Sequence, residues 1–179
     1  MNKIIYNIIS LTKNEKCFHI INKIGGIDNY NLILPNLYLG NIKTSYDIDF
    51  LKKHNIKAIV NCTENESYSD YFKDKNTFRL DVNDSKEENN IIKFKNQIIK
   101  AIEFIDINLK ENNPIFVHCY WGLMRSATVI ASYLIMKYKI SYIDAIAIIK
   151  EKRPKALSSF YNFNEILKYV EKTYKDQNL

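Results

Sequence analysis

The stretch Ile-Phe-Val-His-Cys-Tyr-Trp-Gly-Leu-Met-Arg-Ser, residues 115–126, decides the fold of this 179-residue chain. Its first residues form a short apolar run after Pro114, which predicts a buried strand, and the residues after Arg125 predict a helix. The chain has only three histidines, three cysteines, three arginines and four glycines. One of each falls within residues 118–125, between that strand and that helix. Such a concentration of rare residue types indicates a functional site.

The loop between the strand and the helix has a physical rationale at each fixed position. Its backbone N–H groups can turn inward around an anion, and the helix N-terminus adds a partial positive charge, so both favour the thiolate of Cys119 as a nucleophile. Arg125 offers a planar fork for two phosphate oxygens. Gly122 permits a turn that a Cβ would resist, and Ser126 can donate a hydrogen bond to the Cys119 sulfur. The pattern predicts a cysteinyl-phosphate intermediate and a substrate-binding loop made of Tyr120, Trp121, Gly122, Leu123, Met124 and Arg125.

The rest of the chain alternates predicted strands and helices. Continuous apolar residues at 56–62 predict a buried parallel strand, and residues 37–39 and 77–82 predict two more. This alternation predicts an α/β domain with a central, mostly parallel sheet flanked by helices. The core is expected to begin near Leu32, and helices are expected at 44–54, 89–110, 125–138, 141–152 and 159–174.

At residues 118–126 the sequence resembles the dual-specificity branch of the protein tyrosine phosphatase superfamily. The resemblance extends to residues 36–40, which look like the entry strand of that family, and to residues 58–63, which look like its first buried strand. Residues 152–154, Lys-Arg-Pro, look like the end of the helix that follows the family's loop. The resemblance covers about residues 32–170.

Several expectations follow from this resemblance. It implies a protein phosphatase acting on phosphotyrosine and phosphoserine/threonine, with helices on both sides of the sheet and the phosphate loop at the edge of the sheet. No cofactor is implied, and no metal is expected because the sequence has no metal-ligand spacing. The catalytic domain is expected over residues 32–174, after an N-terminal extension (1–31) and before a short C-terminal tail (175–179).

A second catalytic group is needed to protonate the leaving oxygen and later to activate water. The family places an aspartate on a loop after the strand that precedes the long helix. That loop corresponds here to residues 80–85, and Asp84 falls at the matching position. Asp81 is the alternative, although it lies closer to the strand.

Composition narrows the setting of the protein. No apolar run is long enough to span a bilayer. An odd, sparse set of three cysteines argues against a disulfide framework and favours a reducing compartment, so we expect a cytoplasmic protein. The net charge of +6 would suit nucleic acid, but the lysines are scattered along the chain rather than gathered in a stripe. We therefore expect phosphoprotein substrates, and neither a membrane nor a nucleic acid as partner.

Three other functions remain open on the same scaffold. A phosphoinositide phosphatase of the superfamily usually carries lysine in the loop, and residues 120–124 contain none. An RNA 5′-phosphatase is favoured by the basic charge but not by any clustered basic patch. A phosphopeptide-binding pseudophosphatase typically lacks the cysteine, the arginine or the aspartate, whereas Cys119, Arg125 and Asp84 are all present.

Two further hypotheses concern residues outside the motif. The apolar residues of Ile4–Leu11 either pack on the domain or form a homodimer, as in a resembling poxvirus-like viral phosphatase; the composition suits a viral or a protist origin. Cys62 and Cys119 each end a buried strand, so their thiols are expected to lie close together. Residues 61–64 also resemble the place where the lipid-phosphatase branch keeps a cysteine that pairs with its nucleophile. The alternative is that Cys62 simply fills space in the core.

Overall fold

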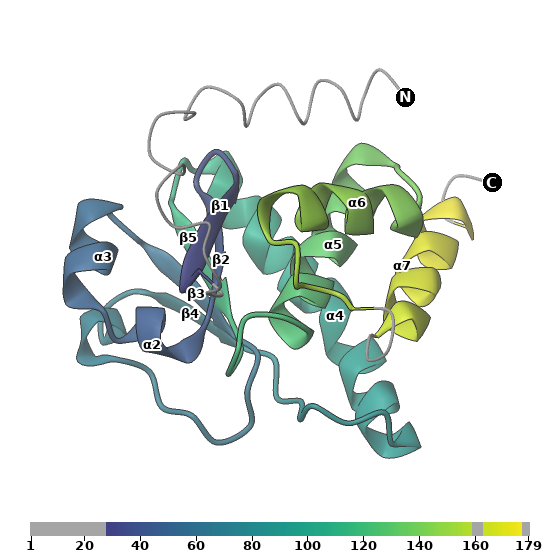
Figure 1. Ribbon diagram of the computed structural model, residues 1–179, viewed down its shortest axis with the longest axis horizontal. Coiled ribbons are helices and arrows are strands. Elements are labelled where there is room, and N and C mark those ends of the chain that lie inside the picture. Colours follow the sequence, from purple (N-terminus) through teal and green to yellow (C-terminus); the bar gives the residue numbers. More distant parts are fainter. Residues whose placement is uncertain (1–27, 159–162, 177–179) are drawn as a thin grey trace.

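A five-stranded mixed sheet forms the centre of the molecule (Figure 1). The computed structural model describes residues 28–158 and 163–176. The strand order is β1-β2-β5-β3-β4; β1 and β2 are antiparallel, and every other neighbouring pair among the described strands is parallel. The strand that leads to the cysteine, β5, therefore has a neighbour on each side. The strands are β1 (Tyr30–Leu34), β2 (Leu37–Gly40), β3 (Ala58–Asn61), β4 (Asn76–Arg79) and β5 (Ile115–His118).

Strand β5 is buried on both faces because two apolar clusters cover the sheet. Ile115 and Val117 belong to the larger cluster, and Phe116 between them belongs to the smaller one. This is the alternation expected of a strand, whose successive side chains point to opposite faces. Every residue of β5 and of β3 is buried, which explains why both segments contain continuous apolar runs.

The four long helices cover one face of the sheet, and the short helices cover the other (Figure 1). Helix α5 contacts β5 and β2 and is packed against α4, α6 and α7. Because it is enclosed in this way, its residues 125–135 are all buried. In the described part of the chain, no helix combines the length and the apolar character needed to cross a membrane. The helices are α2 (Ile42–Ser45), α3 (Ile48–Lys53), the 3-10 helix η2 (Asp70–Phe72), α4 (Glu88–Lys110), α5 (Arg125–Tyr138), α6 (Tyr142–Lys152) and α7 (Asn164–Asp176).

The sequence-based prediction of a mostly parallel sheet flanked by helices is confirmed. Two elements were predicted wrongly. The strand expected at 77–82 ends at Arg79, and the chain leaves the sheet while the side chains of Leu80 and Val82 stay buried in the larger cluster. The single helix expected at 44–54 is two helices, because Asp47 accepts a hydrogen bond from the Phe50 N–H and caps a new helix there.

The beginning and the end of the domain also differ from the expectation. Strand β1 was not predicted, and it begins at Tyr30, two residues before the expected start of the core. Helix α7 continues to Asp176. The predictions on the N-terminal segment, up to residue 27, and on the helix start at Ser159 lie outside the described residues.

Candidate functional site

The loop that carries the cysteine joins the central strand to the central helix. Cys119 follows β5, and Arg125 is the first residue of α5. Ligand sites of open α/β sheets form at this edge, where parallel strands end. Gly122 has a φ of 68°, and a Cβ at this position would lie 2.4 Å from the carbonyl oxygen of Gly40. The turn of the loop against the end of β2 therefore requires glycine at position 122.

The Cys119 sulfur accepts two hydrogen bonds from its own loop and helix. The Gly122 N–H and the Ser126 hydroxyl each donate to it at 3.2 Å. The residue is 2% exposed, and Ser126 is fully buried. Two fixed donors stabilise negative charge on a sulfur atom that little water reaches. The structure therefore brings together three of the residues that the sequence singled out.

Arg125 is buried but incompletely bonded. Its Nη1 donates to the Val82 carbonyl oxygen at 3.2 Å, and its Nη2 lies 3.9 Å from the Asp84 carboxylate. Its Nε has no hydrogen-bond partner among the described residues, although the residue is only 7% exposed. Buried polar groups are nearly always hydrogen-bonded. A buried guanidinium with an unused donor is therefore suited to bind an anion.

The two candidate aspartates lie in different surroundings. The Asp81 carboxylate forms an ion pair with Lys93 at 2.8 Å. The backbone N–H of Asp81 donates a hydrogen bond to the side-chain oxygen of Gln97. Asp84, whose side chain is 36% exposed, is the one that faces Arg125. The geometry therefore favours Asp84 for a role at the site.

One buried side chain holds the loop of Asp84 on both sides of that residue. Asn90, at the start of α4, accepts a hydrogen bond from the Asn83 N–H at 3.0 Å and donates to the carbonyl oxygens of Asn83 and Ser85 at 3.0 and 2.7 Å. Asn90 is 5% exposed. The sequence reasoning missed it, because the bonds depend on where α4 packs against the loop.

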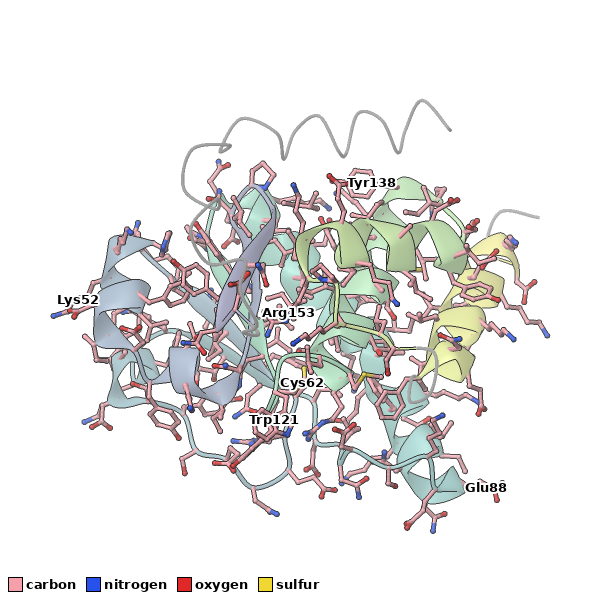
Figure 2. All side chains as sticks on the ribbon, in the orientation of Figure 1. Lys52, Cys62, Glu88, Trp121, Tyr138 and Arg153 are labelled. Atoms are coloured by element: carbon pink, nitrogen blue, oxygen red, sulfur yellow. The ribbon has the colours of Figure 1, made fainter. Side chains whose placement is uncertain are left out.

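Arg153 is the second buried arginine at the loop, and only the family resemblance had drawn attention to it. It donates to the carbonyl oxygens of Gly122 and Trp121 at 2.7 and 3.2 Å, and to the Asp28 carbonyl and the Asn31 side chain near β1. Figure 2 shows Arg153 in the interior and Trp121 below it. Burial lowers the pKa of the Arg153 guanidinium. By binding these carbonyls on one side, Arg153 fixes the peptide planes of the loop.

His118 precedes the cysteine, and it is a buried side chain that stays uncharged at neutral pH. It is 1% exposed, and its ring stacks on Phe116 at a centroid distance of 5.7 Å. Burial lowers the pKa of His118 to about 3. Neither ring nitrogen has a hydrogen-bond partner among the described residues. The side chain is therefore a neutral packing group under the strand end.

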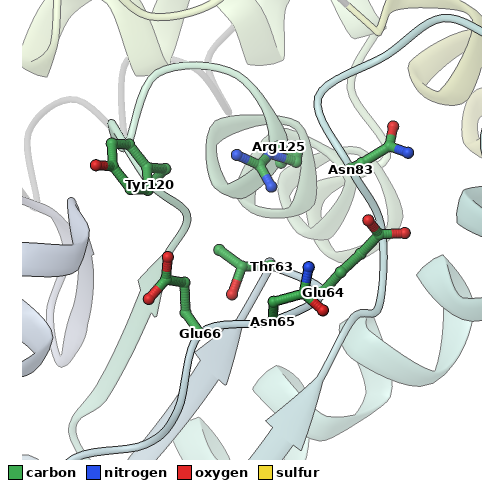
Figure 3. Close-up of a pocket in the computed structure, with 7 residues that line it drawn as sticks. All are labelled: Thr63, Glu64, Asn65, Glu66, Asn83, Tyr120 and Arg125. Atoms are coloured by element: carbon green, nitrogen blue, oxygen red, sulfur yellow. The ribbon is translucent and has the colours of Figure 1, made fainter.

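A pocket of about 180 Å³ opens above Arg125 (Figure 3). Of the predicted loop residues, Tyr120 and Arg125 line it, whereas Cys119 is buried and is not among the lining residues. Met124 packs in the larger cluster and Leu123 packs against it, so what these two can offer an anion is their backbone N–H groups. Sequence reasoning missed the opposite wall, which comes from the segment after β3. The lining consists of Thr63, Glu64, Asn65, Glu66, Asn83, Tyr120 and Arg125.

Trp121 is the most exposed residue of the loop, at 59%. Its ring meets that of Tyr120 edge-on at 5.2 Å, so the two form an aromatic rim beside the pocket. Within residues 28–158 and 163–176, no group of three or more His, Cys, Asp or Glu side chains is suited to hold a metal ion.

Comparisons with known proteins agree with this geometry. The family described as "dual specificity phosphatase, catalytic domain" matches residues 37–173. Human dual specificity protein phosphatase 16 is 31% identical over 145 residues, which cover 81% of this chain and 21% of that protein. Tyrosine-protein phosphatase vhp-1 of Caenorhabditis elegans is 32% identical over 153 residues, 85% of this chain and 23% of that protein. The chain thus spans less than a quarter of the length of these relatives.

Solved structures show the same fold. A mouse putative dual specificity phosphatase complexed with zinc tungstate has a TM-score of 0.75 at 21% identity, and covers 86% of this chain and 93% of its own. Human DUSP28 has a TM-score of 0.72 at 19% identity, over 82% of this chain and 95% of its own. From the family match over most of its length, this chain belongs to the dual specificity phosphatase family.

Proposed function

We propose that this protein hydrolyses phosphotyrosine and phosphoserine/threonine in proteins through a cysteinyl-phosphate intermediate. One observation carries the proposal: Cys119, whose sulfur accepts hydrogen bonds from two donors, shares a loop with Arg125, whose buried Nε finds no hydrogen-bond partner among the residues that the structure describes. A nucleophile and an anion-binding group at the end of one strand are what transfer of a phosphoryl group requires. The relatives named above are phosphatases, which supports the same activity here.

The first half of the reaction breaks the bond from phosphorus to the substrate oxygen. Arg125 and the loop N–H groups bind the phosphate, and the Cys119 thiolate attacks phosphorus from below. Asp84 donates its proton to the leaving oxygen, which departs as a neutral alcohol. Its carboxylate lies 3.9 Å from the Arg125 Nη2 atom, at the mouth of the site.

The second half releases phosphate and restores the cysteine. Water attacks phosphorus while the Asp84 carboxylate takes one of its protons, and the sulfur–phosphorus bond breaks. Ser126, which donates to the Cys119 sulfur at 3.2 Å, stabilises the departing thiolate. Asp84 is then protonated again, and the site is ready for another substrate.

The same features argue against the other functions. Residues 120–124 bring no lysine for the additional phosphates of a phosphoinositide. The wall opposite the loop carries Glu64 and Glu66, which would repel the backbone of an RNA. A pseudophosphatase typically lacks the cysteine, the arginine or the aspartate, whereas this chain carries Cys119, Arg125 and Asp84.

The proposal is tested by measuring phosphate release from four substrates: a phosphotyrosine peptide, a phosphothreonine peptide, a phosphoinositide and a 5′-triphosphorylated RNA. We expect turnover of both peptides, and none by the Cys119→Ser variant. Turnover of the lipid or the RNA alone would contradict the proposal.

Two finer proposals accompany the activity. Cys62 and Cys119 are both free thiols, which supports a reducing compartment such as the cytoplasm. The apolar residues of Ile4–Leu11 need a surface to cover, which is either the domain itself or, in a homodimer, a second copy of the chain. Light scattering on the full chain and on a variant that lacks residues 1–27 tests the second proposal, because a monomer in both samples would contradict it.

A further inference from the structure

Two carboxylates line the pocket, a third belongs to Asp84 beside Arg125, and the three differ in whether a cation accompanies them. Glu64 lies 3.2 Å from Lys93, and Asp84 lies 3.9 Å from Arg125. Glu66 lines the same pocket, and no ion pair to it is formed by the described residues. Unlike Glu64, Glu66 can therefore form an ion pair with a cationic group of a ligand.

The backbone of Glu66 is held in place by buried and charged groups. Its carbonyl oxygen accepts hydrogen bonds from the Asn61 side chain at 2.9 Å and from Arg79 at 2.7 Å. Arg79 also donates to the Thr63 carbonyl at 2.7 Å, and its guanidinium lies 5.0 Å from the centre of the Tyr68 ring. These hydrogen bonds already order the backbone around Glu66, so a ligand that binds there loses little free energy in ordering it.

Glu66 is placed to contact a substrate residue next to the phosphorylated one, not the phosphate itself. Figure 3 shows Glu66 across the pocket from Tyr120 and at the same end, whereas Glu64 and Asn83 lie toward the other end. The phosphate belongs at Arg125, whose buried Nε is unused by the described part of the chain. Residues beside the phosphorylated one then extend over the rim. A cationic side chain there lies near the Glu66 carboxylate and the exposed ring of Tyr120, and both groups attract a cation.

We propose that Glu66 makes this enzyme select phosphopeptides that carry lysine or arginine next to the phosphorylated residue. The inference rests on the proposed function, because it concerns the substrate of the same site. It runs against the overall charge of the chain, since +6 by itself would favour acidic peptides. A preference for basic flanks must therefore come from a local carboxylate.

The experiment measures kcat/KM for one phosphotyrosine peptide made in three versions, in which the residues flanking the phosphotyrosine are lysine, glutamine or glutamate. p-Nitrophenyl phosphate, which has no flanks, reports the phosphatase reaction itself. The variants are Glu66→Gln and Glu66→Lys. The control is Asp74→Lys, an exposed carboxylate that does not line the pocket, and it changes the net charge as much as Glu66→Lys does.

We expect the wild-type protein to favour the lysine peptide over the glutamate peptide by roughly twofold to tenfold, the scale of partly exposed charge pairs. Glu66→Gln should reduce this ratio, Glu66→Lys should invert it, and Asp74→Lys should leave it as in the wild type. The ratio should also shrink at high salt, because the pair is accessible to ions.

The outcomes separate the inference from the function on which it rests. Turnover of all three peptides at equal kcat/KM overturns the selection by Glu66 and leaves the phosphatase function standing. So does an equal response of the ratio to Asp74→Lys and Glu66→Lys, since net charge would then explain it. A wild-type protein that hydrolyses neither the peptides nor p-nitrophenyl phosphate overturns the proposed function itself.

Discussion

The loop of Asp84 depends on a single buried amide, and replacing that amide is the sharpest test of how the acid is positioned. Asn90 forms three hydrogen bonds with the backbone of Asn83 and Ser85, the two neighbours of Asp84. Asn90→Leu keeps a side chain of similar volume and removes all three bonds. The predicted result is a loop that still forms but no longer holds Asp84 over the site.

The magnitude follows from the bonds that are lost. Each contributes about 0.5–1.5 kcal/mol net, so three are worth roughly 2–4 kcal/mol. The loop is partly exposed, and water replaces some of what is lost, so we take about 2 kcal/mol. Since 1.4 kcal/mol is tenfold in an equilibrium, the equilibrium constant for ordering the loop falls by about 30-fold, which sets the upper limit of the effect on kcat.

The assay compares two aryl phosphates. Phenyl phosphate needs its leaving oxygen protonated, so its kcat should fall by roughly 10- to 30-fold in Asn90→Leu, less than the roughly 10²–10⁴-fold that complete loss of the general acid costs. p-Nitrophenyl phosphate has a better leaving group and should lose only about twofold. Asn89→Leu, at the exposed neighbouring position, is the matched control and should behave as the wild type. An equal fall on both substrates would refute the reasoning, because it would indicate general damage to the site.

The remaining predictions concern the reacting groups. Cys119→Ser should abolish turnover and retain phosphopeptide binding, so residual activity above about 1% would exclude Cys119 as the nucleophile. Arg125→Lys should be nearly as damaging, because the charge stays but the bidentate fork is lost. Asp84→Asn should lower kcat for phenyl phosphate by roughly 10²–10⁴, whereas the same effect from Asp81→Asn would assign the acid to Asp81. Peroxide inactivation should be reversed by dithiothreitol in the wild type and much less in Cys62→Ser, because the Cys62 thiol displaces water from oxidised Cys119 and forms a reducible disulfide. Equal recovery of the two proteins would mean that Cys62 only fills space in the core.

The positions of Cys62 and Cys119 bear on whether the two thiols can form a disulfide. The Cys62 N–H donates to the His118 carbonyl at 2.8 Å, so the two cysteines follow neighbouring positions of paired strands. Cys62 is fully buried, and burial together with the charge of Cys119 raises the pKa of its thiol. The oxidation must therefore begin at Cys119, and Cys62 must act as the second thiol.

The sequence by itself determined the features that depend on neighbours along the chain. Cys119 and Arg125 lie with Gly122 in the eight consecutive residues 118–125, between a predicted strand and a predicted helix, so their spacing alone predicted a phosphate-binding turn. The buried strands β3 and β5 were found for the same reason, because burial on both faces leaves a continuous apolar run. Where local capping competed with the apolar pattern, as at Asp47, the prediction was wrong.

Only the tertiary structure decided the features that join distant segments. Arg153 bonds to the carbonyl of Gly122 across 31 positions of sequence, and Glu66 reaches the pocket because β3 lies beside β5 in the sheet. Asn90 holds the loop of Asp84 because α4 packs where that loop leaves the sheet. The strand order and the helix packing bring these groups together, and both result from burial of apolar surface over the whole domain. The local sequence pattern does not predict which distant side chain will contact the loop.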